Sequence, residues 1–261
     1  MVGIARSTFY YQRKKSLAED KYFVIKQQIK SIYYEHRGRY GYRRVTAAMR
    51  QMGELINHKT VQRLMKVLGL KSLVRTKRYI SFKGNAGLAA PNRLKRNFSA
   101  TKANQKWTTD VTEFNVAGEK LYLSPILDLF NGEIIAFETS RRPVYKMVES
   151  MLNKAFERLS PKDKPILHSD QGWQYRMAAY KVSLRSRGLV QSMSRKGNCL
   201  DNAAMESFFA VLKTEFFYLN KFTCIEQLEK GIQEYIHYYN HDRIKLKLKG
   251  LSPVQYRNQS S

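Results

Sequence analysis

The sequence has few acidic residues, few cysteines and no long apolar run, and each shortage excludes a class of protein. It contains 21 Asp and Glu against 47 Lys and Arg, so its 261 residues carry a formal net charge of +26. Such a surplus favours a polyanionic partner, and nucleic acid suits it better than a membrane surface. No apolar run reaches the roughly 18 residues of a membrane-spanning helix, and the opening MVGIARSTFYYQRKK lacks the apolar core of a signal peptide. We therefore expect no membrane partner.

The two cysteines, Cys199 and Cys224, have no CxxC spacing, which argues against a disulfide scaffold and against a cysteine-based zinc site. They suit a protein of the reducing cytoplasm. His237 and His241 share one face of a predicted helix, but without cysteines nearby a zinc site is the weaker interpretation.

Hydrophobic residues make up 43% of the chain, which predicts a folded protein. Residues 1–70 predict a small all-helical region, with a basic fragment at 1–20 and helices over 21–36, 43–53 and 56–70. Asn57 is the expected N-cap of the third helix, and Gly69 marks its end. Two short helices joined by a tight turn fit either a helix-turn-helix module or a helical hairpin with a solvated basic face. The positive charge of the whole chain favours the first interpretation.

A basic linker is expected at residues 71–103, because its first part is rich in Lys and Arg, contains no acid and is interrupted by Gly84, Gly87 and Pro91. Such a segment could follow the phosphates of DNA. The DNA contacts predicted here and in the helical region are Arg43, Arg44, Lys59, Arg63, Arg75, Lys77 and Arg78.

Residues 104–216 predict an α/β domain with a mixed sheet flanked by helices, and residues 217–261 a helical tail. The first three strands are expected to follow one another through turns, and helices then alternate with two further strands. The expected strands span 106–116, 121–130, 134–140, 165–170 and 189–194, and the expected helices span 146–159, 177–188 and 201–216.

Two acids occupy places in this sheet where chemistry could use them. Asp110 falls inside the first predicted strand, and Asp170 ends the fourth. Ligands of open α/β sheets gather at the carboxyl ends of strands. Paired carboxylates in a basic protein are suited to holding Mg²⁺ against a phosphate, because Mg²⁺ prefers oxygen ligands and keeps positions open for water and substrate.

A third acid is expected on the helix predicted at 201–216. Asp201 is better placed to cap the start of that helix, and Glu215 lies near its far end. Glu206 remains, with Lys213 seven residues further on the same face. We therefore expect Glu206 to complete a metal site and Lys213 to reach phosphate beside it.

Other residues near the sheet have competing interpretations. We expect Glu113 to face away from the site, Asp128 to be structural and Trp107 to lie in the core. His168 could orient Asp170 or contact phosphate, but a packed core position is the stronger interpretation. Trp173 is evenly divided between stacking on an unpaired base and packing. The aromatic and polar residues Tyr238, Tyr239, Asn240 and Arg243 are expected to pack.

Together these residues carry a resemblance. Asp110, Asp170 and Glu206, with 35 residues between the last two, resemble the DDE signature of retroviral-type integrases and transposases. WTTDVTEF, HSDQGWQY, GNCLDNAAMESFFAVLKTE and YIHYYNHDRIKLKLKGLSPVQY resemble the OrfB subunit of frameshifting insertion-sequence transposases, whose type member is insertion sequence three. HRGRYGYRRVTAAMR resembles the helix-turn-helix segment of that family. The match runs in order over nearly the whole chain.

The resemblance implies an RNase H-like fold, two Mg²⁺ (or Mn²⁺) ions, and metal-dependent cleavage and strand transfer at the ends of an insertion sequence. Asp110, Asp170 and Glu206 then take the metal-ligand roles, and Lys213 matches the basic position beyond the glutamate. It also implies a bacterial, nucleoid-associated protein of the cytoplasm that binds element ends and target DNA. A homo-oligomer on DNA is expected, as is a helix-turn-helix partner encoded by an upstream reading frame.

Two other functions use many of the same features. A non-catalytic DNA-binding regulator could retain the fold, although such a protein gains nothing from acids that face DNA. A hydrolytic nuclease would share the site but would have no use for a module that recognises element ends.

Overall fold

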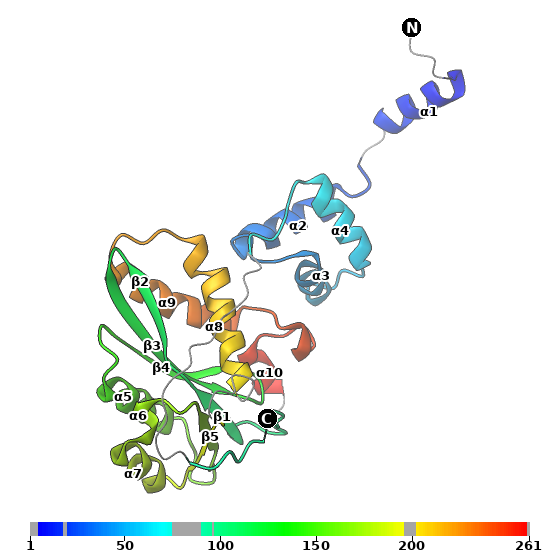
Figure 1. Cartoon of the computed structure of the whole chain (residues 1–261). Coiled ribbons are helices and arrows are strands. Elements are labelled where there is room, and N and C mark those ends of the chain that lie inside the picture. The colour runs from blue at the N-terminus through cyan, green and yellow to red at the C-terminus, as the bar shows by residue number, and fades with distance from the viewer. Residues whose placement is uncertain (1–4, 18–19, 75–89, 96, 196–201, 260–261) are drawn as a thin grey trace. The chain divides into compact units, whose positions relative to one another are not determined.

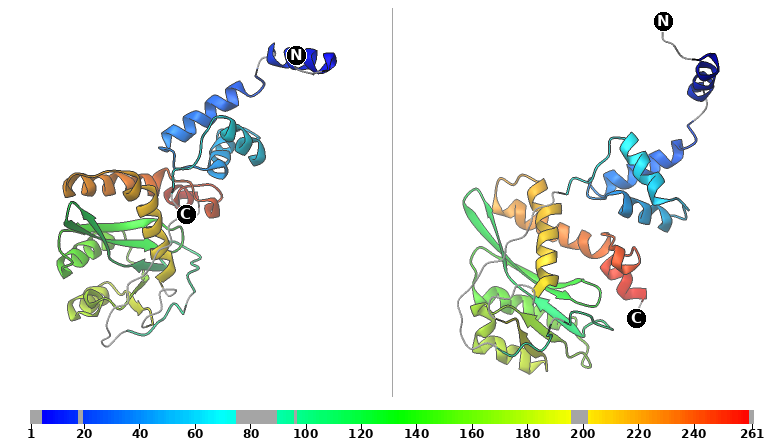
Figure 2. Two further views of the ribbon diagram at one scale, coloured as in Figure 1. Left: turned by 45° about the horizontal axis from the view of Figure 1, so that its top comes forward. Right: turned by 45° about the vertical axis from the view of Figure 1, so that its right-hand side comes forward.

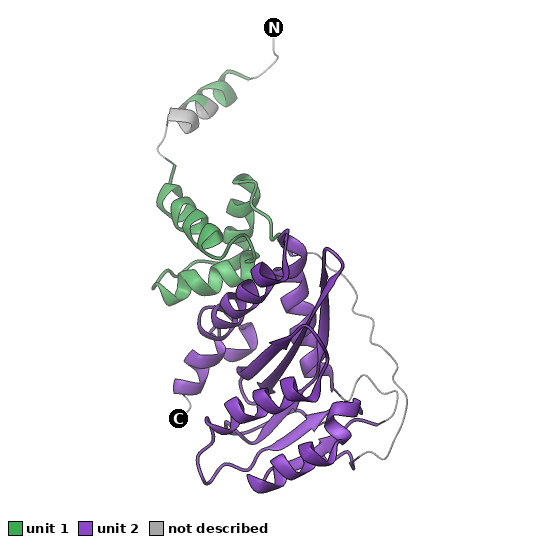
Figure 3. Ribbon diagram, turned by 90° about the vertical axis from the view of Figure 1, so that its left-hand side faces the viewer, with its two compact units in different colours: residues 1–73 green, residues 74–261 purple. Residues whose placement is uncertain are grey.

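The computed structural model describes residues 5–17, 20–74, 90–95, 97–195 and 202–259. The chain divides into two compact units, residues 1–73 and residues 74–261 (Figure 3). Within the described ranges, no helix is both long enough and apolar enough to cross a membrane.

The first unit is helical, as the sequence predicts. Its helices are α1 (Arg6–Leu17), α2 (Phe23–Glu35), α3 (Tyr42–Gln51) and α4 (His58–Val67). α1 lies where the sequence was interpreted only as a basic fragment. The cap at Asn57 is confirmed, since its side chain accepts a hydrogen bond from the N–H of Lys59 at 2.8 Å. Past α4, Gly69 takes a left-handed φ of 69°, which a residue with a side chain rarely adopts.

A small apolar core holds α2, α3 and α4 together. Each helix contributes residues spaced three or four apart, so one face of each is buried and the other is solvated. The buried residues include Ile29, Ile32, Val45, Met49, Val61 and Leu64. The outer face of α4 carries the exposed Lys59, Arg63 and Lys66. The two predicted helices are therefore present as α3 and α4, and residues 52–57 connect them.

The second unit is built on one mixed sheet of six strands (Figure 1). β3 pairs antiparallel with β4 on one side and with β1 and β2 on the other, and β1, β5 and β6 run parallel to one another. The strands are β1 (Lys106–Thr109), β2 (Thr112–Val116), β3 (Glu119–Asp128), β4 (Ile134–Ser140), β5 (Ile166–Ser169) and β6 (Val190–Met193).

The strand predicted over 106–116 is divided in two, so the prediction that Asp110 lies inside a strand is wrong. The pairs Thr109 with Ile126 and Thr112 with Leu123 belong to one continuous register, which places Asp110 opposite Pro125. Proline has no N–H to donate, so the ladder is interrupted at this point. Asp110 consequently lies just past the carboxyl end of β1.

Helices cover both faces of the sheet (Figure 2). Residues of α5 and α7 share one core with Trp107, Ile126 and Leu167, which confirms that Trp107 is a core residue. Residues of α8 and α9 share the other core with Leu121, Leu123 and other strand residues. The helices of this unit are α5 (Tyr145–Phe156), α6 (Trp173–Arg176), α7 (Ala178–Ser186), α8 (Ala203–Glu215), α9 (Ile225–His241) and α10 (Pro253–Gln259).

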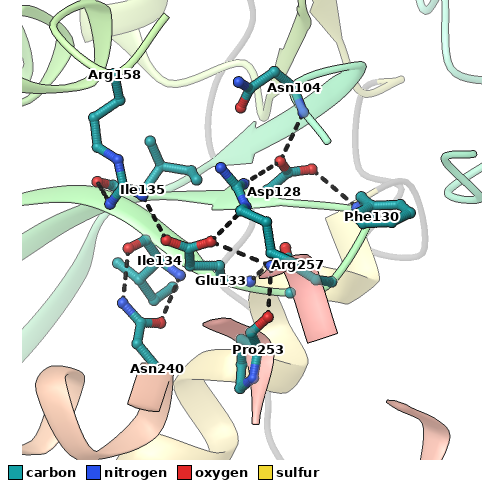
Figure 4. Close-up of polar contacts among 12 residues, drawn as sticks. Asn104, Asp128, Phe130, Glu133, Ile134, Ile135, Arg158, Asn240, Pro253 and Arg257 are labelled. Carbon is teal, nitrogen blue, oxygen red and sulfur yellow. Dashed lines mark hydrogen bonds and ion pairs between the residues drawn. The ribbon is translucent and has the colours of Figure 1, made fainter. Parts of the chain in front are cut away.

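Buried ion pairs and hydrogen bonds join the C-terminal helix α10 to the sheet (Figure 4). Arg257 donates to Asp128 at 2.7 Å, and its Nε lies 2.8 Å from a carboxylate oxygen of Glu133. The carboxylate of Asp128 also accepts the N–H groups of Asn104 and Phe130, each at 2.9 Å. Asp128 is therefore structural, as its sequence context predicts, and α10 packs with the sheet.

Candidate active site

Asp110 and Asp170 follow neighbouring parallel strands at the same edge of the sheet. β1 and β5 are paired with Thr108 opposite His168, and each acid comes two residues later. Adjacent strands lie about 4.8 Å apart, so the register brings the two carboxylates side by side. Asp110 accepts the N–H of Val111 at 2.7 Å, and Asp170 accepts the N–H of Gly172 at 2.9 Å. Both residues are intermediate in exposure, so neither is fully enclosed by the protein.

The electrostatics of this pair favour a cation. Burial raises the pKa of Asp110 well above its usual range, and the negative charge of Asp170 raises it further. Burial also raises the pKa of Asp170, while the N–H of Gly172 and the guanidinium of Arg176 oppose that shift. The ion pairs among the described residues engage other acids. Two close carboxylates without an ion-pair partner would be stabilised by a bound cation.

Glu206 and Lys213 reach this region from α8. Glu206 is in the first turn of the helix, and its negative charge contributes to the raised pKa of Asp110. Lys213 is in the last turn, with its Nζ 5.3 Å from the ring centroid of Phe114 on β2. Burial lowers the pKa of Lys213, and the charges of Glu113 and Asp110 oppose that change. One helix therefore supplies an acid and a base that both act on Asp110.

The donor atoms fit a hard divalent cation. Asp110, Asp170 and Glu206 offer only carboxylate oxygens, which are the ligands that Mg²⁺ prefers. Within the described ranges, no three side chains of the His, Cys, Asp and Glu types are grouped closely enough to hold one ion together. Asp110 and Asp170 are neighbours through the strand register and interact electrostatically, while Glu206 does not complete a three-ligand cluster with them within the described ranges.

Asn202 also lies near the site, one turn before Glu206, and the sequence pattern predicted no role for it. It is buried immediately before α8, and its side chain is hydrogen-bonded to Thr108 and to the carbonyl of Thr109. The expected cap of this helix was Asp201, which lies outside the described residues. The only local signal was an asparagine at a helix start, a position that such residues occupy for many reasons.

The structure bears on the alternatives left open for Trp173 and His168. Trp173 begins α6 just after the Asp170 turn, and its side chain is 48% exposed, so it is available for stacking. His168 is fully buried, with its Nδ1 2.8 Å from the hydroxyl of Ser192, in agreement with a packed position.

Glu113 is exposed on β2 and paired with Lys120 at 3.2 Å. The rings of His237 and His241 stack at 4.4 Å on α9.

The basic residues predicted to contact DNA have different surroundings. Arg43 and Lys59 are exposed at the starts of α3 and α4. Arg44 lies with its guanidinium carbon 5.5 Å from the ring centroid of Tyr40, and Arg63 lies 5.1 Å from that of Tyr22. Arg75, Lys77 and Arg78 lie outside the described residues.

Comparisons with known proteins agree with this architecture. Two models, each described as integrase core domain, match residues 100–199 and 206–260, and a model described as HTH-like domain matches residues 20–78. The chain is 58% identical to the putative transposase InsK for insertion sequence element IS150 of Escherichia coli (strain K12), over 98% of this chain and 91% of that protein. It is 32% identical to the transposase InsF for insertion sequence IS3A of the same strain, over 100% of this chain and 92% of that protein.

The fold also resembles a solved structure, the HTLV-2 integrase catalytic core domain in complex with magnesium. The TM-score is 0.50 with 17% sequence identity, and the match covers 60% of this chain and 98% of that one. At this level of identity the likeness concerns the fold, which is the RNase H-like arrangement expected from the sequence.

Proposed function

The chain belongs to the insertion-sequence transposases that carry an integrase core domain, and from that premise we propose that Asp110, Asp170 and Glu206 are its catalytic residues. The protein is a DDE-type transposase with an HTH-like domain ahead of the core. The observation that carries the assignment is the placement of Asp110 and Asp170 at the ends of adjacent parallel strands, where they lack an ion-pair partner among the described residues.

These three residues would hold the divalent ions on which the reaction depends, Mg²⁺ or Mn²⁺, and two ions are proposed. When bound, such ions activate the attacking oxygen and stabilise the leaving oxygen of an in-line displacement at phosphorus. The magnesium named for the HTLV-2 integrase core supports this choice. Asp110 and Asp170 contribute fixed positions, since each carboxylate is held by a backbone N–H. Glu206 adds its oxygens from the helix side.

The basic residues hold the substrate. Lys213 is proposed to bind a phosphate beside the carboxylates, because its ammonium is half-buried next to the site. Trp173 is proposed to stack on a base near the cleavage point. DNA binding itself follows from the two kinds of domain, and Arg43, Arg44, Lys59, Arg63, Arg75, Lys77 and Arg78 are proposed as its phosphate and base contacts.

A reaction of two displacements accounts for transposition at this site. A water molecule attacks the phosphodiester at the element end and releases a 3′-hydroxyl, which then attacks a second strand in the same way. No serine or tyrosine nucleophile is needed, because the attacking group is never part of the protein. The proton of each attacking group leaves to solvent or to a nearby carboxylate.

The proposed assembly is a homo-oligomer on DNA that works with, or is fused to, a helix-turn-helix protein from an upstream reading frame. Nonspecific binding needs only a basic surface, whereas recognition of element ends needs base contacts positioned by more than one module. We propose that this chain alone discriminates element ends poorly. Competition binding at fixed salt, with end DNA against scrambled DNA, tests it. Discrimination of about a hundredfold or more by the chain alone would contradict it.

The catalytic assignment is tested with a labelled element-end duplex and Mg²⁺. Wild-type protein should yield both nicked and joined products. Glu206→Gln removes one charge with little change in shape, so it should retain DNA affinity and lose cleavage by at least about 100-fold. Glu119→Gln, an exposed carboxylate paired with Arg141, is the control and should cleave normally.

Each alternative function has its own outcome in this assay. A non-catalytic regulator would bind the duplex without any cut product. A hydrolytic nuclease would give nicked DNA without joined DNA. Equal loss of binding and cleavage in Glu206→Gln would assign Glu206 a structural role instead.

A further inference from the structure

A pair of hydrogen bonds joins the start of α8 to β1 directly beside Asp110. The side chain of Asn202 accepts the hydroxyl hydrogen of Thr108 and donates through Nδ2 to the carbonyl oxygen of Thr109 at 3.3 Å. Asn202 is 4% exposed, and both threonines are fully buried. The contact spans more than 90 positions of the sequence, so it is a tertiary link between two elements of the site.

A proposed catalytic acid lies close to each end of this contact, one after β1 and the other in α8. Thr109 immediately precedes Asp110, and Asn202 precedes the helix turn that contains Glu206. Helix and strand are rigid over such short distances, so a fixed contact at Asn202 sets the spacing between their side chains. We propose that Asn202 is a positioning residue that fixes the start of α8, and with it the helix turn that carries Glu206, relative to Asp110, an inference that rests on the proposed catalytic roles.

The usual role of an asparagine in this place does not account for it. An asparagine before a helix commonly accepts an N–H of the first turn, but the side chain of Asn202 makes no such hydrogen bond with α8. Its amide is used instead on β1, with one donor and one acceptor engaged. Because the amide of Asn202 bonds to β1 and not to α8, its removal should shift the position of the helix start. It should have less effect on the formation of the helix.

The other end of α8 is secured independently. Glu215, in the last turn, accepts two hydrogen bonds from Arg243 at 2.7 Å each and one from Tyr235 at 3.1 Å. These contacts attach α8 to α9 and its C-terminal end, away from Asp110. The helix therefore has one anchor for its packing and a separate one, at Asn202, for its position relative to the acids.

The chain offers a matched control for this role. Asn240 is also a buried asparagine with two hydrogen bonds to backbone, from the N–H of Ile134 and to its carbonyl, each at 2.9 Å. It lies on α9 and contacts β4, so it touches neither Asp110 nor α8 through these bonds. Asn202→Ala and Asn240→Ala thus remove equal numbers of buried hydrogen bonds from different places.

The experiment compares full-length variants for cleavage of element-end DNA as a function of Mn²⁺ concentration. Asn202→Ala should raise the half-saturating metal concentration about 10-fold or more, as loss of a group that orients a metal ligand does, with partial recovery at high metal. Asn240→Ala should leave that concentration unchanged. An equal response of the two variants would overturn the proposal and reduce Asn202 to a packing residue.

The partner residue gives a second, reciprocal test. Thr108→Val removes the hydroxyl with little change in shape and should shift the metal dependence in the same direction as Asn202→Ala, but by less, because the hydrogen bond from Asn202 to the carbonyl of Thr109 remains. Thr108→Ser keeps the hydroxyl and should match wild type. The double variant Thr108→Val/Asn202→Ala should be no worse than Asn202→Ala alone, because Asn202→Ala already removes the hydrogen bond that Thr108→Val breaks. Additive effects, or a defective Thr108→Ser, would contradict the link.

Hydrogen exchange supplies a readout that does not depend on activity. Without metal or DNA, Asn202→Ala should speed amide exchange in the second turn of α8, whose N–H groups bond to the carbonyls of the first turn, and leave its last turn protected by the Glu215 contacts. An equal increase in exchange rate along the whole of α8 in Asn202→Ala would mean that Asn202 stabilises the entire helix, and the proposal would fail. If wild type itself does not cleave, or if Asp110→Asn cleaves normally, the proposed function fails instead.

Discussion

At the scale of single residues, the position of the Asp170 carboxylate depends on the absence of a side chain at Gly172. The glycine donates its N–H to the carboxylate at 2.9 Å. Its φ of −53° is ordinary, so conformational freedom is not the reason for glycine here. A Cβ at this position would lie 3.0 Å from Oδ1 of Asp170 and 2.9 Å from Oε1 of Gln174. A methyl group at this position would therefore require the Asp170 carboxylate and the end of the Gln174 side chain to shift.

Gly172→Ala should therefore impair catalysis more than folding. The added methyl group displaces the Asp170 carboxylate, and loss of ligand orientation should lower the cleavage rate by about 10- to 100-fold. The thermal midpoint, measured by circular dichroism, should move little because the turn lies at the surface of the sheet edge. A folded variant with a wild-type cleavage rate would contradict the prediction.

Lys213 has a role distinct from that of the acids. Lys213→Ala should weaken binding to element-end DNA and lower the slope of affinity against salt by about 0.9, the value for one phosphate contact. Lys146→Ala on α5, which covers the opposite face of the sheet, is the control; the side chain of Lys146 is 85% exposed. If the metal midpoint moves in Lys213→Ala while DNA affinity and slope do not, the phosphate contact is the wrong assignment.

At the scale of elements, the junction of α8 and α9 depends on one buried ion pair. The side chains of Arg243 and Glu215 are 5% and 3% exposed and lie 2.7 Å apart. The guanidinium of Arg243 keeps its charge despite burial, because its hydrogen bonds and the charge of Glu215 raise its pKa above the usual range. The carboxylate of Glu215 is buried away from solvent, so the stability of its negative charge depends on the pairing with Arg243.

Removing one partner should cost more than removing both. Arg243→Met leaves the Glu215 charge buried and should lower the free energy of unfolding by about 3–5 kcal/mol. Glu215→Met combined with Arg243→Met should recover most of that loss, because no unpaired charge remains. Urea unfolding followed by circular dichroism measures all three proteins. A double variant as unstable as the single one would show that shape, not charge, dominates the junction.

At the scale of the whole molecule, the chain has 47 basic and 21 acidic residues, and we expect the resulting positive charge to dominate its affinity for DNA. Neutralised phosphates release condensed counterions, so the logarithm of affinity should fall linearly with the logarithm of salt concentration, by about 0.9 per phosphate contact. Duplex of unrelated sequence should show nearly the same slope, since the charge term carries no base information. Fluorescence anisotropy at several salt concentrations measures it, and a flat response would contradict charge-driven binding.

Much of this protein could be predicted from its sequence, for identifiable reasons. The helices of the first unit follow from apolar residues spaced three and four apart, and the start of α4 follows from Asn57. Asp170 was predicted at a strand end because the glycine after it breaks a short apolar run. The positive charge predicted DNA as the partner without any structural information. The helix and strand signals lie within a few neighbouring residues, and the charge is a sum over the chain, so none of them requires knowledge of the tertiary structure to be detected.

Tertiary structure alone decided the features that join distant residues. The strand predicted over 106–116 is interrupted at Asp110 because Pro125 lies opposite it, and only the sheet register reveals that pairing. The contact of Asn202 with β1 and the pairing of Glu215 with Arg243 likewise bring together residues far apart in sequence. Hydrogen bonds between remote residues leave no periodic signal in the chain. The sequence by itself therefore determined most of the helices and strands of this protein, and the packing of those elements decided how Asp110 and Asp170 are held.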